Sequence, residues 1–302
     1  MKLEGLHHVT AITADARRNL EFYATVLGLR FVKKTVNYDA PDVYHLYYGD
    51  EQGTPGSIMT FFEFPGARQG RPGSGMVHTV AWRVATREAL DFWGTRLDHA
   101  GRPVERAHGV LRSSDPEGLA IEIVASSAPD APLAAAAPEI PAEHALLGFD
   151  GVRAYARDPS RPHPLLDRLG FSHGVLAGEQ RRARYAYDPA PAEPGIQGAG
   201  TVHHVAWAAR DEDHEAWHEV ARDGGARPTP IIDRTYFRSI YFRECSGVLF
   251  EIATLSPGFA VDEPADRLGE SLVLPPQHEH LRSELEASLT PLTNPRAIYG
   301  SA

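Results

Sequence analysis

Two pairs of adjacent histidines open two similar segments of the chain, GLHHVTA with His7 and His8 and GTVHHVAW with His203 and His204. A carboxylate, Glu251, lies in the apolar strand-like run GVLFEIA. Alternate residues of a strand face opposite sides, so the face opposite the bulky apolar side chains of this run carries Glu251. An unpaired charge there would be costly, and a cation is the expected partner. These residue types predict a metal site if the fold brings the segments together.

The chain repeats one pattern of a strand, a helix and further strands four times. The copies begin with GLHHVTA, GMVHTVAW, GFDGVRAY and GTVHHVAW, and three of them close with GSIMTFF, GLAIEIV and GVLFEIA. This pattern predicts an α+β fold of four βαβββ modules, which form two half-barrel domains that each curl around a cleft. The modules are placed at 5–65, 75–126, 148–199 and 200–256. The third copy is degraded, and no closing strand is recognisable in it.

The remaining segments connect or cover these modules. The first two modules occupy residues 1–126, and a Pro/Ala-rich linker follows at 127–147. The last two modules occupy 148–256. Residues 257–302 form a tail with an amphipathic helix, which we expect to cap the fold or to make a subunit contact, so a homo-oligomer is considered.

Aligning the modules decides which of them share a metal. On the opening strands the equivalent inward positions are His8, Thr79, Gly151 and His204, and on the recognisable closing strands they are Thr60, Glu122 and Glu251. Pairing the first module with the fourth gathers two histidines and a carboxylate, whereas pairing modules 1 and 2, or modules 3 and 4, gathers one histidine and one carboxylate each. We therefore expect modules 1 and 4 to pair around a metal, and modules 2 and 3 to pair without one.

Two histidines and one carboxylate form the facial triad of non-heme Fe(II) oxygenases, which leaves positions open for a substrate and dioxygen. Mn(II) suits the same donor set. A closed structural zinc site would need a fourth ligand, and Thr60 stands at that place. His45, His78 and His144 do not recur at equivalent positions as the ligand set does, and we assign them structural roles.

Composition excludes several classes of function. The 302 residues carry a formal net charge of -10, which argues against nucleic acid or an acidic membrane surface as the main partner. No stretch has the length and apolar character of a signal peptide core or a membrane span. The single cysteine, Cys245, excludes an internal disulfide framework. We expect a cytoplasmic protein.

Longer stretches of the chain resemble a known family. They are LHHVTAITADARRNLEFYATVLGLRFVKKTVNYD, YHLYYGDEQGTPGSIMTFFEFPGARQG, TVHHVAW, DRTYFRSIYFRECSGVLFEIAT and LGESLVLPP. The chain is similar to the vicinal oxygen chelate superfamily of glyoxalases, bleomycin-resistance proteins and extradiol dioxygenases. Within it, the chain resembles the ring-cleaving branch that contains 2,6-dichlorohydroquinone 1,2-dioxygenase and the quinone-resistance dioxygenases.

The resemblance implies that His8, His204 and Glu251 bind Fe(II), in agreement with the repeat argument. It also implies catalytic roles for residues around the metal, which are Arg234, Tyr241, His203, Thr10 and His7. Arg234 and Tyr241 would stabilise charge on a substrate oxygen, and His203 would move a proton. Strict strand alternation points His7 and His203 away from the metal, so a bulge or a strong twist is needed for them to reach the site.

Three functions follow as hypotheses. The first is an Fe(II)-dependent, or Mn(II)-dependent, ring-cleaving dioxygenase that acts on a small hydroquinone or catechol together with dioxygen. The second is a glyoxalase-type lyase or isomerase, which would want a fourth protein ligand at Thr60. The third is a non-catalytic resistance protein that binds an aromatic compound and needs no metal.

Overall fold

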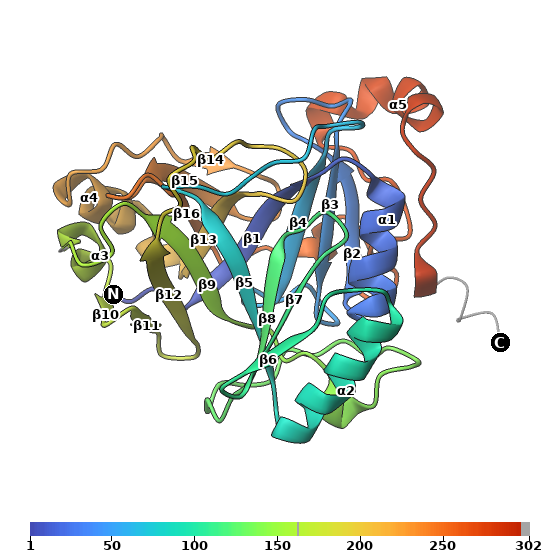
Figure 1. Ribbon diagram of the computed structural model, residues 1–302. Coiled ribbons are helices and arrows are strands. Elements are labelled where there is room, and N and C mark those ends of the chain that lie inside the picture. The colour runs from blue at the N-terminus through green and yellow to red at the C-terminus, as the bar shows by residue number, and fades with distance from the viewer. Residues whose placement is uncertain (162, 297–302) are drawn as a thin grey trace.

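The strands of the protein form two eight-stranded sheets in a computed structural model that describes residues 1–161 and 163–296 (Figure 1). The first sheet has the strand order β14-β15-β16-β13-β1-β4-β3-β2, and the second has the order β10-β11-β12-β9-β5-β8-β7-β6. In each sheet an antiparallel pair of long strands lies at the centre, β1 with β13 and β5 with β9. Each sheet therefore joins two modules through their opening strands.

The first sheet combines modules 1 and 4, as predicted. Its strands are β1 (Leu6–Thr13), β2 (Arg30–Val36), β3 (Tyr44–Gly49), β4 (Ile58–Glu63), β13 (Val202–Ala209), β14 (Ile232–Asp233), β15 (Arg238–Arg243) and β16 (Leu249–Thr254). The closing strand of each module pairs in parallel with its own opening strand, β4 with β1 and β16 with β13. This register brings the ends of β1, β13 and β16 that carry the candidate ligands together.

The second sheet combines modules 2 and 3, which confirms the other half of the predicted pairing. Its strands are β5 (Val77–Val84), β6 (Glu105–Ala107), β7 (Val110–Ser114), β8 (Ala120–Ala125), β9 (Phe149–Ala156), β10 (Phe171–Ser172), β11 (Val175–Ala177) and β12 (Arg182–Pro189). Module 3 has a closing strand that was not recognisable in the sequence, because β12 pairs in parallel with β9. In β12, Arg182 and Arg184 alternate with the buried Ala183 and Tyr185. The charged residues make the segment difficult to recognise as a strand from the sequence.

The helices lie on the outer faces of the sheets. They are α1 (Ala16–Leu20), which continues as a π-helical turn (Glu21–Val26), α2 (Arg87–His99), α3 (Pro164–Arg168), α4 (His214–Asp223) and α5 (Arg282–Ser288), with short 3-10 helices at Ala142–His144, Asp211–Asp213, Phe259–Val261 and Pro276–Leu281. Asp15 caps α1 by accepting hydrogen bonds from the backbone amides of Arg17 and Arg18. In Figure 1, α1 and α2 lie at one end of the molecule, and α3 and α4 lie at the other.

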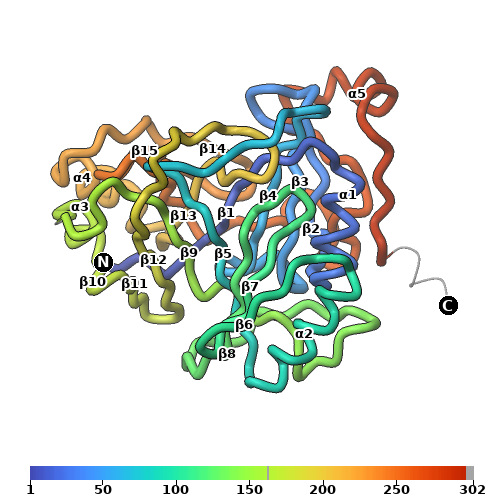
Figure 2. Tube along the Cα trace, viewed as in Figure 1, coloured from blue at the N-terminus to red at the C-terminus, as the bar shows by residue number. Residues whose placement is uncertain are grey.

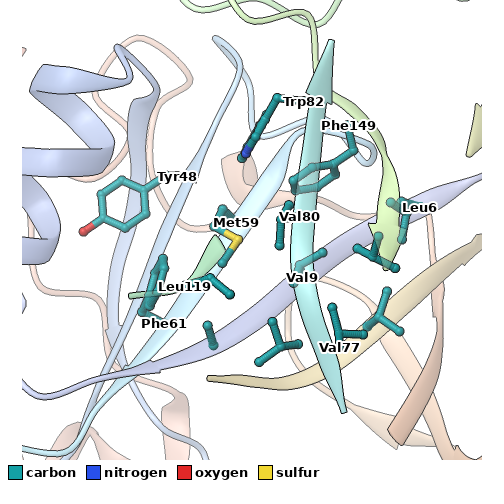
Figure 3. Close-up of a cluster of buried hydrophobic side chains, with 14 of the residues drawn as sticks. Leu6, Val9, Tyr48, Met59, Phe61, Val77, Val80, Trp82, Leu119 and Phe149 are labelled. Atoms are coloured by element: carbon teal, nitrogen blue, oxygen red, sulfur yellow. The ribbon is translucent and has the colours of Figure 1, made fainter. Parts of the chain in front are cut away.

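One apolar core connects both sheets and the helices. Figure 3 shows Leu6 and Val9 of β1 close to Val77 and Val80 of β5, so the two central strands face each other across this core. Trp82 and Phe149 extend the same cluster within the second sheet, with ring centroids 4.4 Å apart. The two half-barrels thus share buried surface, and each keeps its concave face for a cleft.

The central strands are bulged at equivalent places. In the β1–β13 pair, the partners change from Leu6 and Trp207 to His8 and Ala206, so His7 is an extra residue. The same pair changes from Thr10 and His204 to Ala11 and Val202, which makes His203 the extra residue of β13. A bulge of this kind re-aims side chains that strict alternation would turn away.

The tail covers module 1. The buried ammonium group of Lys33 bonds to Asp262 Oδ1 and Glu263 Oε2, each at 2.5 Å. Further along, the ring of His278 bonds to the carbonyl of Tyr38 at 2.9 Å. The tail therefore caps the half-barrel that is formed by modules 1 and 4. At the other terminus, Figure 2 shows the chain beginning beside β10 and β11.

No helix within the described residues is both long enough and apolar enough to cross a membrane.

Candidate metal centre

Three potential ligand atoms meet at the centre of the first sheet. The Oε2 atom of Glu251 lies 3.1 Å from Nε2 of His8 and 2.9 Å from Nε2 of His204. The two imidazole nitrogens are 3.2 Å apart. All three residues are buried, with Glu251 fully so. The predicted ligand set is thus gathered from β1, β13 and β16 into one compact triangle.

The triangle has the dimensions of a metal site. Bonds of about 2.1 Å at right angles place neighbouring ligand atoms about 3.0 Å apart, whereas tetrahedral angles would place them about 3.4 Å apart. Glu251 Oε2 is buried and makes no hydrogen bond within the described part of the chain. A buried carboxylate oxygen without a hydrogen bond is costly unless a cation satisfies it. The residues therefore fit a divalent metal with the facial arrangement.

His7 selects the form of His8 that can bind a metal. Nε2 of His7 lies 3.1 Å from the carbonyl oxygen of Thr254, which can only accept, so this nitrogen carries the proton. A neutral His7 then accepts at Nδ1 from Nδ1 of His8, 2.9 Å away. Nε2 of His8 is left with its lone pair toward the triangle. Burial, and after it the neighbouring His8, lowers the pKa of His7 to about 3, which keeps His7 neutral.

The second histidine pair repeats this contact. Nδ1 of His203 lies 2.8 Å from Nδ1 of His204. If His204 offers Nε2 to a metal, its Nδ1 donates to His203, and the proton of neutral His203 then sits on Nε2. His203 lines the cavity beside the triangle. Burial and the neighbouring His204 lower the pKa of His203 to about 4. His203 is therefore a neutral group that can donate a hydrogen bond from its second nitrogen.

The carboxylate is fixed by its other oxygen. Ser239 of β15 donates a hydrogen bond of 2.5 Å to Glu251 Oε1, so Oε2 keeps its orientation toward the histidines. Burial acts to raise the pKa of Glu251, whereas the positive charge that His8 and His204 carry when protonated would hold it well below its ordinary value. With neutral histidines, a bound metal would supply that positive charge, and the ligand form of Glu251 is the anion.

A chain of hydrogen bonds lies opposite, on the module 1 wall. The hydroxyl of Tyr47 approaches Nδ1 of His45 at 2.8 Å, and Nε2 of His45 approaches the hydroxyl of Thr60 at 2.8 Å. Thr60 in turn donates to Thr10 at 3.1 Å. Thr60 pairs with Thr10 across β4 and β1 as Glu251 pairs with Ala206 across β16 and β13. Thr60 therefore occupies the place related to Glu251 by the repeat, with its hydroxyl already engaged.

The triangle opens onto a cavity of about 370 Å³. His8, His204, His203 and His45 line one part of it, and the remainder is largely aromatic or apolar, with Val36, Tyr38, Phe62, Phe64, Phe237 and Leu249 among the lining residues. A planar aromatic ligand fits a cavity of this size and character.

Arg234 and Tyr241 form the charged edge of this cavity. Nε of Arg234 donates to the hydroxyl of Tyr241 at 3.3 Å, and its guanidinium lies over the rings of Tyr38 and Tyr241, 5.5 and 5.4 Å from their centroids. Burial would lower the pKa of Arg234, but Tyr241, Asp39 and Glu251 raise it. Burial and the charge of Glu251 raise the pKa of Tyr241, which keeps its proton. The edge therefore offers one cation and one hydroxyl donor.

Of the predicted catalytic residues, His203, Arg234 and Tyr241 line the cavity. His7 and Thr10 are buried behind the triangle, where His7 contacts His8 and Thr10 contacts Thr60. Sequence reasoning gave His45 a structural role and did not consider Ser239 or Phe237. The signal for His45 was available, because strand alternation places it on the same face as Tyr47 and beside Thr60.

The equivalent place in the second sheet holds a different set of side chains. Glu122, which matches Glu251, pairs with Arg112 at 3.0 Å. Thr79 and Gly151 stand where His8 and His204 stand in the first sheet. No group of potential metal ligands lies there among the residues that the structure describes.

The fold agrees with comparisons to known proteins. The family model of the Glyoxalase/Bleomycin resistance protein/Dioxygenase superfamily matches residues 5–123 and 144–252, and the chain belongs to this superfamily.

Its relatives include a Bacillus subtilis (strain 168) protein named "Putative ring-cleaving dioxygenase MhqO", 41% identical over 96% of this chain and 97% of that protein. The Chlorohydroquinone/hydroquinone 1,2-dioxygenase of Sphingobium indicum is 31% identical over 94% of this chain and 95% of that protein. A crystal structure of a "putative dioxygenase" from Bacillus subtilis superimposes with a TM-score of 0.88 at 39% identity, over 96% of this chain and 98% of that one.

Proposed function

We propose that this protein is an Fe(II)-dependent ring-cleaving dioxygenase that acts on a hydroquinone or catechol. The observation that carries the proposal is the buried triangle of His8, His204 and Glu251, which faces an aromatic-lined cavity. The names of the relatives support the reaction class, and one of them is a hydroquinone 1,2-dioxygenase. Fe(II) is proposed as the metal and Mn(II) as its alternative, because both suit a mixed nitrogen and oxygen donor set.

Bound at the triangle, such a metal would acidify a phenolic hydroxyl and bring the aromatic ring and dioxygen together. Around it, the protein's own groups orient the ring and handle its charge. Phe237 and Phe62 offer apolar contacts to the ring, while Arg234 and Tyr241 stabilise negative charge on a substrate oxygen. His203 donates a hydrogen bond from Nε2 to a substrate oxygen, because its Nδ1 is engaged by His204.

The two alternative functions are less well supported. A glyoxalase-type reaction would want a fourth ligand at position 60, but the hydroxyl of Thr60 is held by Thr10 and His45. A simple aromatic-binding protein would leave the lone pairs of two buried histidines aimed at a buried carboxylate without a reason. Solved structures of glyoxalase I from Zea mays, 14% identical, share the fold only.

The test is anaerobic reconstitution of the metal-free protein with Fe(II), followed by oxygen uptake on matched hydroquinones and catechols. We expect one dioxygen consumed per ring, loss of the aromatic absorbance, and a preference for one of the two classes. Metal binding without oxygen uptake on any member of the panel would overturn the dioxygenase proposal. The same panel run with Mn(II) decides between the two metals.

A further inference from the structure

A second cluster of ligand-type side chains lies away from the candidate metal centre. His163 precedes helix α3 in module 3, while Glu244 and Cys245 form the turn between β15 and β16 in module 4. One ligand atom from each of the three lies within 4.8 Å of the other two. None of these residues lines the cavity of the first site. The cluster therefore lies between the two half-barrels and is independent of the proposed function.

The buried ring of His163 lacks hydrogen-bond partners among the described residues. Both of its ring nitrogens are shielded from solvent, and neither bonds to another described residue. The ring packs against Tyr187 of β12, with centroids 4.7 Å apart, which fixes its position without satisfying either nitrogen. Buried polar atoms without protein partners are uncommon, and a bound ion or water molecule usually satisfies them.

Glu244 adds a buried negative charge. Its side chain is almost fully buried, and it forms no ion pair within the described part of the chain. Instead it accepts hydrogen bonds from the hydroxyl of Tyr187 at 2.6 Å and from the backbone amides of Ser246 at 2.9 Å and Val248 at 3.0 Å. These bonds hold the carboxylate in place, and a buried anion held in this way is completed by a cation.

Cys245 supplies the third ligand atom and the solvent-exposed side from which a metal ion can enter the cluster. It is the only cysteine of the chain, and its side chain is exposed. A tetrahedral zinc site needs ligand atoms about 3.5 Å apart, and an exposed thiol can rotate toward the other two. Sulfur, imidazole and carboxylate ligands together favour Zn(II) over Mn(II), which prefers oxygen.

We propose that His163, Glu244 and Cys245 form a zinc site that links modules 3 and 4, and so the two half-barrels. Three protein ligands and one water complete four-fold coordination. Tyr187 is the positioning residue, because it packs on His163 and donates to Glu244.

The single cysteine makes the test direct. The full chain, freed of metal and titrated with Co(II), should show a thiolate-to-cobalt charge-transfer band that only Cys245 can produce. Cys245→Ser should abolish the band. His163→Ala and Tyr187→Phe should each raise the apparent Kd for Co(II) at this site about 10-fold or more. His218→Ala, at a half-exposed histidine of α4, is the matched control and should change nothing.

A second measurement needs no variant. One equivalent of Zn(II) beyond that needed for the first site should slow the reaction of Cys245 with a thiol reagent, and a chelator should restore the rate. Absence of the charge-transfer band in the wild type would overturn the proposal, as would thiol labelling that ignores Zn(II). A band with the same affinity in His163→Ala would show cobalt bound by the thiol alone and would also overturn it.

Discussion

Replacing Glu251 with Gln should remove metal-dependent stabilisation while the fold is kept. Glu251 is the one anionic member of the triangle, and Ser239 can still bond to the amide oxygen of the variant. Losing one partner of a buried charged set costs about 3 kcal/mol, which weakens metal binding about 100-fold. A metal at 100 times its Kd stabilises the wild type by about 2.7 kcal/mol, and the same concentration would stabilise the variant by only about 0.4 kcal/mol.

These energies translate into melting temperatures. For a chain of this length, each kcal/mol moves Tm by about 2 °C, so the metal-induced rise should fall from about 5 °C to about 1 °C. The assay is thermal unfolding with and without Mn(II), together with metal analysis per chain. A Cys245→Ser background removes the second candidate site.

The matched control is Glu122→Gln. Glu122 stands at the equivalent position of the second half-barrel, where it pairs with the half-exposed Arg112. Its replacement should leave both the metal content and the Tm rise unchanged. If Glu251→Gln kept one metal per chain and the full rise, or if Glu122→Gln lost them, the assignment of the metal to modules 1 and 4 would be refuted.

Three further predictions concern other parts of the molecule. Thr60→Glu should keep the metal but stop oxygen uptake by adding a ligand at the place related to Glu251; equal uptake at equal iron content would contradict it. Arg234→Met should lower kcat about 100-fold without changing metal content, because it removes the cation beside Tyr241; an unchanged kcat would show that Arg234 does not act on the substrate. Burial raises the pKa of Asp115 to about 6 from 3.8, so its contribution to stability is present below about pH 4 and is lost as pH rises through 6. Asp115→Asn should remove up to about 3 kcal/mol of this pH dependence in denaturant unfolding, and an unchanged pH profile would contradict the burial argument.

The pairing of the modules could be predicted from the sequence because it depends on which modules carry residue types that can bind a metal. His8, His204 and Glu251 are too costly to bury separately, and one arrangement of the modules collects them. The closing strand β12 could not be predicted in the same way. Its polar face, with Arg182 and Arg184, opens toward the cleft of the second half-barrel, so the run lacks the apolar content that marks the other closing strands.

The surroundings of the triangle were harder to predict than the triangle itself. His7 and His203 reach their neighbours because each is the extra residue of a bulge, and strict alternation, applied to the sequence, turns them away. His45 was taken as structural because it does not recur in the repeats. Its place depends on hydrogen bonds to Tyr47 and Thr60, which connect three strand positions that sequence spacing alone does not relate.

The bulges are a feature of the fold and do not depend on the presence of metal ligands. The second half-barrel has the same register changes in β5 and β9, which make His78 and Asp150 the extra residues. Nδ1 of His78 lies 2.8 Å from the hydroxyl of Thr79, much as Nδ1 of His7 lies 2.9 Å from Nδ1 of His8. The contact between a bulge residue and its neighbour is therefore kept when the neighbour is no longer a ligand.

The strands of the second half-barrel that correspond to the candidate metal centre carry a set of ion pairs. His78 and Arg153 both bond to Asp188, and Arg83 bonds to Asp150. Asp150, Glu122 and Asp188 there each pair with an arginine, whereas Oε2 of Glu251 meets the two histidines, whose lone pairs also point inward. The same arrangement of strands can thus neutralise its buried charges with salt bridges or leave a buried carboxylate for a bound cation to neutralise. This difference between two copies of one scaffold within a single chain is the physical ground for placing the metal in one half-barrel and not in the other.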